Sequence, residues 1–134
     1  MLVRRCLAGC LLFATALLAA PVQAFDLNGQ WATDPDLCSK IFTRKGKEIV
    51  FSPLSDLYGS GFMVDGGRLR GKLGRCTVKS RSEDGATIDM AAGCTSSIAA
   101  QDMQIRLKVI DDNTVARLFP GLSGLEVNFH RCKL

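Results

Sequence analysis

The sequence is poor in the side chains that most enzymes use, because it contains one histidine, His130, one tryptophan and one tyrosine. A histidine-rich metal site needs several imidazoles, and a hydrolytic triad needs a nucleophile and a carboxylate around its histidine. Neither pattern surrounds His130, and no paired acidic motif is present elsewhere. We therefore expect a protein that is not an enzyme, holds no metal and no cofactor, and carries His130 on its surface.

Long hydrophobic runs are also missing, with one exception near the N-terminus. Residues 7–20 form an apolar run of about 14 residues, shorter than the roughly 20 that a membrane span needs. Arg4-Arg5 precedes the run, and the small-x-small end Val22-Gln23-Ala24 follows it. These are the three parts of a secretory signal peptide. We expect residues 1–24 to be cleaved after Ala24, leaving residues 25–134 as one soluble domain that does not span a membrane.

Two further export signals overlap the same segment. Leu7-Ala8-Gly9-Cys10 resembles a lipobox, which would attach a lipid to the cysteine, and Arg4-Arg5 resembles a twin-arginine signal. A lipobox cysteine follows the apolar run, whereas Cys10 precedes most of it, so we expect no lipid anchor. The twin-arginine route exports chains that are already folded. Disulfides form more readily after an unfolded chain has been threaded into an oxidising space, so we do not expect the twin-arginine route to be used. The alanine-rich signal and the lack of an N-x-S/T sequence after residue 24 favour the bacterial periplasm over eukaryotic secretion.

Four cysteines remain after residue 24: Cys38, Cys76, Cys94 and Cys132. An even count in a small exported chain predicts two disulfides, and none of these spacings is the close pair of a zinc site. The equal spacings 38–76 and 94–132 favour two separately closed halves. The turn at 83–86 would instead bring Cys76 opposite Cys94 and leave Cys38 for Cys132. Both pairings remain open.

Apolar and polar residues alternate with a period of two over most of the chain, which predicts β-strands. The expected strands begin at Gly29 and then cover residues 47–52, 60–65, 68–73, 76–80, 86–91, 104–110, 114–119 and 125–132. Asp34 and Pro35 are typical of a helix start, and predict one short helix over residues 34–42. We expect an all-β fold, either a small antiparallel up-and-down barrel of about eight strands or a sandwich, with one short helix and two disulfides.

The same alternation assigns one face of each strand to the interior. The candidates are Ile49, Phe51, Phe62, Val64, Leu69, Val78, Ile88, Met90, Leu107, Leu118 and Phe129. A barrel of this size is either filled by its own side chains or holds one small ligand. We favour a filled interior, because so short a core is usually needed for stability.

Gly29-Gln30-Trp31 on the first strand and Arg131 on the last resemble the calycin superfamily of lipocalin-like barrels. The resemblance implies that Trp31 packs across the base of the barrel against Arg131, a contact worth about 0.5–2 kcal/mol that closes the first strand onto the last. It also implies a carrier of a small apolar ligand or lipid. Small periplasmic inhibitors of bacterial metalloproteases are similar in length and share the G-x-W start. Those inhibitors insert an N-terminal segment into the protease. Only residues 25–28 would precede Gly29 in the mature chain, which counts against that activity here.

A basic segment is the clearest polar feature, since six cations and no acid lie between Asp65 and Glu83. Alternation places the three cations before Gly74 on one face of their strand: Arg68, Arg70 and Lys72. The three cations after Gly74 likewise share a face of the next strand: Arg75, Lys79 and Arg81. The two rows predict a positive stripe that attracts anions such as lipid headgroups, polysaccharide phosphates or an acidic protein. A solubilising outer face explains the same pattern and is the simpler interpretation. Aromatic residues are not interleaved with these cations, so we expect no nucleic-acid partner.

We therefore expect an exported, monomeric, non-enzymatic binding protein. The first hypothesis is a lipocalin-like carrier of a small apolar ligand. The alternative is an envelope interaction module that uses the basic stripe.

Overall fold

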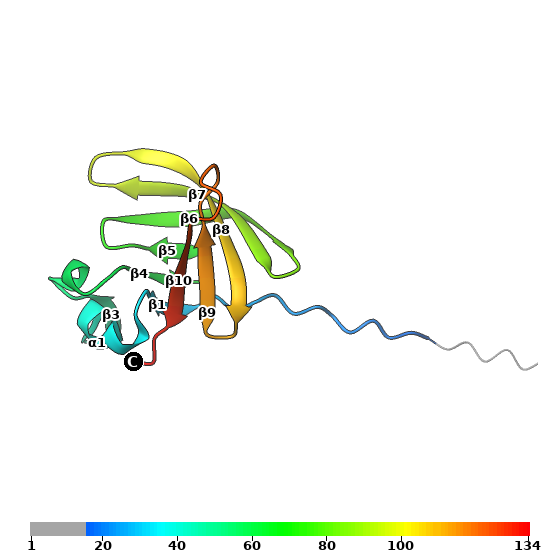
Figure 1. The fold of residues 1–134 in the computed structure, drawn as a ribbon, viewed down its shortest axis with the longest axis horizontal. Helices are drawn as coiled ribbons and strands as arrows, with labels where there is room; N and C mark the ends of the chain where they lie inside the picture. Colours follow the sequence, from blue (N-terminus) through cyan, green and yellow to red (C-terminus); the bar gives the residue numbers. More distant parts are fainter. Residues whose placement is uncertain (1–15) are drawn as a thin grey trace, which may run out of the picture.

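The computed structural model describes residues 16–134, and this part of the chain contains ten strands. Eight of them close into one antiparallel barrel in the order β1-β10-β9-β8-β7-β6-β5-β4 (Figure 1). The bounds of these eight are β1 Gly29–Ala32, β4 Gly61–Asp65, β5 Arg68–Arg70, β6 Gly74–Asp84, β7 Thr87–Ser96, β8 Ala100–Asp111, β9 Thr114–Leu118 and β10 Glu126–Arg131. The all-β prediction is confirmed, and of its two forms the barrel is the correct one.

The barrel is an up-and-down meander that its first strand closes. From β4 to β10 each strand pairs with the next one along the chain, and β1 lies between β10 and β4. Trp31 is opposite Arg131 on one side and opposite Phe62 on the other. Closure gives each of these eight strands a neighbour on both sides, which is how small β proteins limit edge-to-edge association, and residues 100–105 of β8 extend beyond the part that pairs with β9.

The segment between β1 and β4 forms a second layer outside the barrel. It contains the 3₁₀ turns η1 (Pro35–Leu37) and η2 (Ser55–Leu57), the helix α1 (Cys38–Ile41) and a hairpin of β2 (Phe42–Lys45) and β3 (Glu48–Phe51). The predicted helix exists, and the Asp34 carboxylate accepts a hydrogen bond from the Asp36 backbone N–H at 2.9 Å. It ends one residue earlier than expected, because Phe42 already pairs with Phe51 in the hairpin.

The two disulfides are Cys76–Cys94 and Cys38–Cys132. Cys76 and Cys94 are directly opposite each other on β6 and β7, as the turn between these strands requires. Cys38–Cys132 fastens α1 to the end of β10. The pairing suggested by the equal spacings is therefore wrong, and the pairing suggested by the hairpin is correct.

Two groups of buried side chains correspond to the two layers. The barrel core is formed by Leu27, Trp31, Val64, Leu69, Ile88, Met90, Leu107, Val115 and Phe129. A smaller group fills the space between the barrel wall and the second layer: Ala32, Cys38, Ile41, Phe42, Met63 and Cys132. Ile49 and Phe51 pack against this second group, so their assignment to the barrel interior is wrong.

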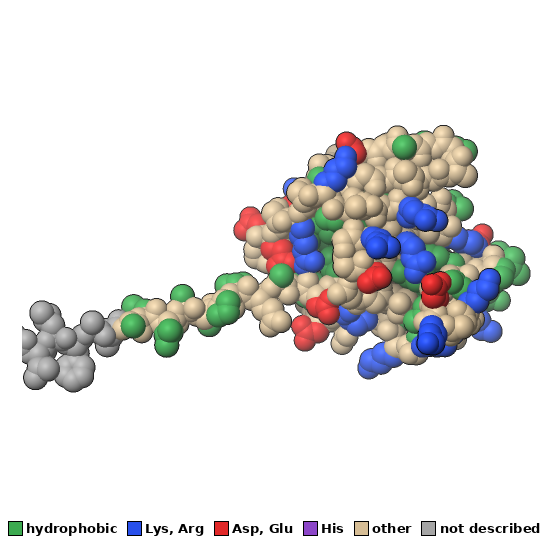
Figure 2. Space-filling model, turned by 180° about the vertical axis from the view of Figure 1, so that it is seen from behind, with side chains coloured by type: hydrophobic (Ala, Val, Ile, Leu, Met, Phe, Trp, Pro, Cys, Tyr) green, Lys and Arg blue, Asp and Glu red, His purple; other side chains and the backbone are tan. Residues whose placement is uncertain are grey.

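Residues 16–24 extend away from the barrel with exposed hydrophobic side chains, which Figure 2 shows as the green tail. Leu17, Leu18 and Val22 are each at least 96% exposed. The predictions that concern Arg4, Arg5 and Cys10 lie outside the described residues. Between residues 16 and 134 there is no helix with the length and apolar character needed to span a membrane.

Candidate ligand-binding site

Trp31 and Arg131 lie together at one end of the barrel, which we call the base. The Arg131 guanidinium carbon is 4.3 Å from the Trp31 ring centroid. The same guanidinium donates hydrogen bonds to the backbone carbonyls of Asn28 at 2.6 Å and Asp26 at 2.7 Å. Trp31 Nε1 donates to the Leu27 carbonyl at 2.8 Å. The two residues thus hold the chain that enters the barrel against its last strand.

Aromatic rings fill the barrel above this base. Phe62 stacks on Trp31 with ring centroids 6.1 Å apart, and its other side meets Phe129 edge-on at 5.0 Å. These distances lie within the range of favourable aromatic pairs. Trp31 is completely buried, whereas Phe62 is only partly buried because it also lines an open space.

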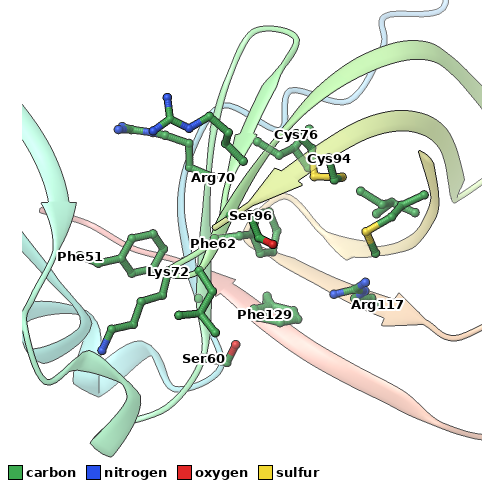
Figure 3. Close-up of a pocket in the computed structure, with 18 of the residues that line it drawn as sticks. Phe51, Ser60, Phe62, Arg70, Lys72, Cys76, Cys94, Ser96, Arg117 and Phe129 are labelled. Atoms are coloured by element: carbon green, nitrogen blue, oxygen red, sulfur yellow. A yellow bond between two sulfur atoms is a disulfide. The ribbon is translucent and has the colours of Figure 1, made fainter. Parts of the chain in front are cut away.

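That open space is a cavity of about 770 Å³ that extends from the other half of the barrel to the second layer, where Phe51, Ser55 and Asp56 line it (Figure 3). Its apolar walls include Phe62, Leu69, Met103, Ile105, Leu107 and Phe129, together with the Cys76–Cys94 disulfide. Met103 and Ile105 face inward and yet remain partly exposed. The expectation of a filled interior is therefore wrong for this half of the barrel and right only for the half that contains Trp31.

Unequal strand lengths explain the hollow half. Strands β6, β7 and β8 have 11, 10 and 12 residues, whereas β9 and β10 across the barrel have 5 and 6. The long strands continue past the ends of the short ones, so inward side chains there have no facing strand to pack against. An apolar wall without a facing wall leaves space for a molecule other than the protein.

An ion pair bridges the mouth of the cavity. Lys72, in the turn between β5 and β6, contacts the Asp56 carboxylate in η2 and donates a hydrogen bond to the Pro53 carbonyl at 3.1 Å. The hydrogen bond from Lys72 holds the pKa of Asp56 below its ordinary value of 3.8. Both residues line the cavity, so the contact connects the second layer to the barrel rim.

The six cations of the predicted stripe do not stay together. Arg68, Arg70 and Arg75 share the outer face of β5 and β6, and Arg70 is directly opposite Arg75. Lys72 lies in a turn and is paired with Asp56. Lys79 sits at a β-bulge, where it forms an ion pair with Asp102 at 2.6 Å.

The bulge also moves Arg81 off the outer face. The register shifts by one residue between Val78 and Ser80, so Arg81 is opposite the inward-facing Met90. One extra residue reverses the facing of every later side chain in a strand. Arg81 contacts Glu83 and donates a hydrogen bond to the Phe25 carbonyl at 2.6 Å near the base. The sequence prediction that Arg75, Lys79 and Arg81 share a face is therefore wrong.

Arg117 is the residue that sequence reasoning missed. It is opposite Leu107 on β8 and Val127 on β10, both of which pack into the barrel interior, and it lines the cavity. Leu118, which was assigned to the interior, instead pairs with Arg106 and Glu126 on the outer face. Strict alternation from Val115 is the sequence signal that places Arg117 on the inward face.

Arg117 is partly buried, and its guanidinium carbon is 4.9 Å from the ring centroid of Phe119. Figure 3 shows it on one side of the cavity, with Lys72 and Phe51 on the other. Within residues 16–134 the Arg117 side chain has no ion pair and no hydrogen-bond partner. Among the cations of residues 16–134 that line the cavity, Arg117 is the one on β9.

The remaining candidates in the described part of the chain are His130 and a metal site. His130 lies on β10, and its Nδ1 is 3.4 Å from the Thr114 hydroxyl. Over residues 16–134 no group of three or more His, Cys, Asp or Glu side chains could hold a metal ion. The chain matches no protein-family model, no curated protein and no solved structure with which it was compared.

Proposed function

We propose that this protein is an exported, non-enzymatic binding protein that carries a small apolar ligand or lipid in the open half of its barrel. The apolar cavity of about 770 Å³ is the observation that carries the proposal. Small-molecule sites typically have volumes of about 300–1,000 Å³ and mainly apolar linings with a few polar groups. The cavity meets both criteria, and the similarity of Gly29-Gln30-Trp31 and Arg131 to lipocalin-like barrels supports the same function.

Two observations support export. A pair of disulfides is typical of proteins that fold in oxidising compartments, and the Cys38–Cys132 bridge joins segments 94 residues apart in the sequence. The hydrophobic segment 16–24 makes no part of the barrel, so its removal after Ala24 would leave the fold intact. We infer a periplasmic or secreted protein whose mature chain begins at Phe25.

The neutral fluorescent probe N-phenyl-1-naphthylamine tests the carrier function directly. We expect the protein recovered after expression of the full chain to bind the probe with an increase in fluorescence. Ile105→Trp should weaken binding at least tenfold, because the indole would occupy the cavity that Ile105 faces.

Gln104→Trp is the matched control, because Gln104 is the next residue on the same strand and is exposed on the outer face. It should bind the probe as the unchanged protein does. Equal binding by the two tryptophan variants would show that the probe does not enter the barrel, and no binding by the unchanged protein would refute the carrier function.

The outer face of β5 and β6 supports a second candidate function, an envelope interaction module. Arg68, Arg70 and Arg75 lie on one face, and within the described residues none forms an ion pair. Such a cluster would attract an anionic lipid surface or polysaccharide. Salt-sensitive binding to anionic vesicles that is lost when all three become Glu would support this function, and binding that survives the change would refute it.

A further inference from the structure

The charges around the cavity are strongly one-sided. Four cations line it, Arg70, Lys72, Arg75 and Arg117, against a single acid, Asp56. That acid is already paired with Lys72. Three guanidinium groups therefore face or border an apolar cavity without a neutralising carboxylate from the cavity wall, which makes the site attractive to an anion.

Arg117 differs from the other two arginines because it belongs to the interior. Arg70 and Arg75 lie on the outer face of the barrel wall, whereas Arg117 lies between Leu107 and Val127 on the inner face. A guanidinium has five N–H donors and stays charged at any physiological pH. The Arg117 guanidinium carbon lies over the Phe119 ring, and its N–H groups have no acceptor in the described residues. No buried side-chain nitrogen there lacks a partner, so these N–H groups remain accessible to water or to a ligand in the cavity.

We propose that the ligand is an amphiphile with an anionic head, whose carboxylate or phosphate is bound by Arg117 while its apolar part lies against Phe62 and Phe129. This inference rests on the proposed carrier function and adds the chemical class of the ligand. The planar guanidinium fits a carboxylate or a phosphate through two parallel hydrogen bonds. The apolar rings next to the cavity provide the surface that a hydrocarbon chain buries.

Competition against the bound naphthylamine probe tests the inference with ligands that share one chain length. Palmitate and hexadecyl phosphate are the anions, and hexadecanol is the neutral analogue. We expect the unchanged protein to bind at least one anion ten times or more tightly than hexadecanol. The comparison of the two anions distinguishes a carboxylate site from a phosphate site.

Two methionine variants then locate the charge. Arg117→Met keeps an apolar stem and removes the guanidinium, so the preference for the anion over hexadecanol should disappear. Lys108→Met, which removes a cation from the outer face of β8, should keep the preference. Thermal unfolding of both variants checks that each is folded.

The alternative outcomes are distinguishable. If the unchanged protein binds hexadecanol as tightly as the anions, the inference about the head is wrong and the carrier function stands. If it binds neither the probe nor any competitor, the carrier function itself is wrong. If the preference survives Arg117→Met and is lost in an Arg70→Met, Arg75→Met double variant, the head binds at the outer rim and the assignment to Arg117 is refuted.

Discussion

The two disulfides should contribute unequally to stability, because they close loops of very different length. Cys38–Cys132 joins residues 94 apart, whereas Cys76–Cys94 joins residues 18 apart. A crosslink stabilises the fold mainly by reducing the entropy of the unfolded chain, and this effect grows with the logarithm of loop length. The two lengths give about 4.7 kcal/mol for the long loop and about 3.2 kcal/mol for the short one at 25 °C.

The folded structure increases this difference. Strands β6 and β7 remain paired over ten register positions when the Cys76–Cys94 bridge is removed. The helix α1 has four residues and packs on the barrel through the small group of side chains that includes Cys38 and Cys132. Loss of the Cys38–Cys132 bridge therefore also weakens the attachment of the second layer.

Guanidinium unfolding of two double variants measures the difference. Replacement of both residues by Ala should lower the free energy of unfolding by about 1.5 kcal/mol more for the Cys38, Cys132 pair than for the Cys76, Cys94 pair. Both variants should show a larger dependence on denaturant concentration, because an uncrosslinked chain exposes more surface on unfolding. An equal loss in the two variants, or a greater loss for the 76–94 pair, would refute the loop-length reasoning.

Two further predictions concern the barrel seam and the cavity mouth. Gly61→Val should lower the free energy of unfolding by about 1–3 kcal/mol in a denaturant titration, because a Cβ there would lie 2.8 Å from the Trp31 carbonyl oxygen. Gly67→Val is the control, because a Cβ there meets nothing within 4 Å, and it should change the free energy of unfolding far less. The lowered pKa of Asp56 means that its ion pair with Lys72 stabilises the fold above pH 3.8 and is lost as the pH falls through the lower folded-state pKa. An NMR titration of Asp56 should show that pKa returning toward 3.8 in Lys72→Met, and an unchanged value would contradict the assigned cause.

The features that follow from local pattern were predictable from the sequence. Alternation and turn residues predicted the strands and hairpins of an all-β fold, with a barrel or a sandwich as its form, because each hairpin is specified by residues a few positions apart. Asp34 and Pro35 predicted the helix start for the same reason. Trp31 and Arg131 are at opposite ends of the domain, and the resemblance to lipocalin-like barrels, rather than any local pattern, brought them together.

Other features depend on relations that alternation cannot show. The bulge at Lys79 is a single extra residue, and nothing in its own neighbourhood marks it, because the partner strand determines the register. The hollow half arises from a difference in length between strands on opposite sides of the barrel. Leu118 is hydrophobic and yet faces outward, so hydrophobicity alone predicts the wrong face for this strand.

Arg117 and the cavity are most informative when they are considered together. A cavity loses packing contacts, and an arginine in its wall gains no hydrogen bond or ion pair from the described residues in return. A leucine at position 117 would face Leu107 and Val127 and would bury more apolar surface with them. Sites that violate the local rules of packing in this way are where function is expected. Two disulfides in a chain of this size supply stability that packing does not, and they permit a barrel that stays half open.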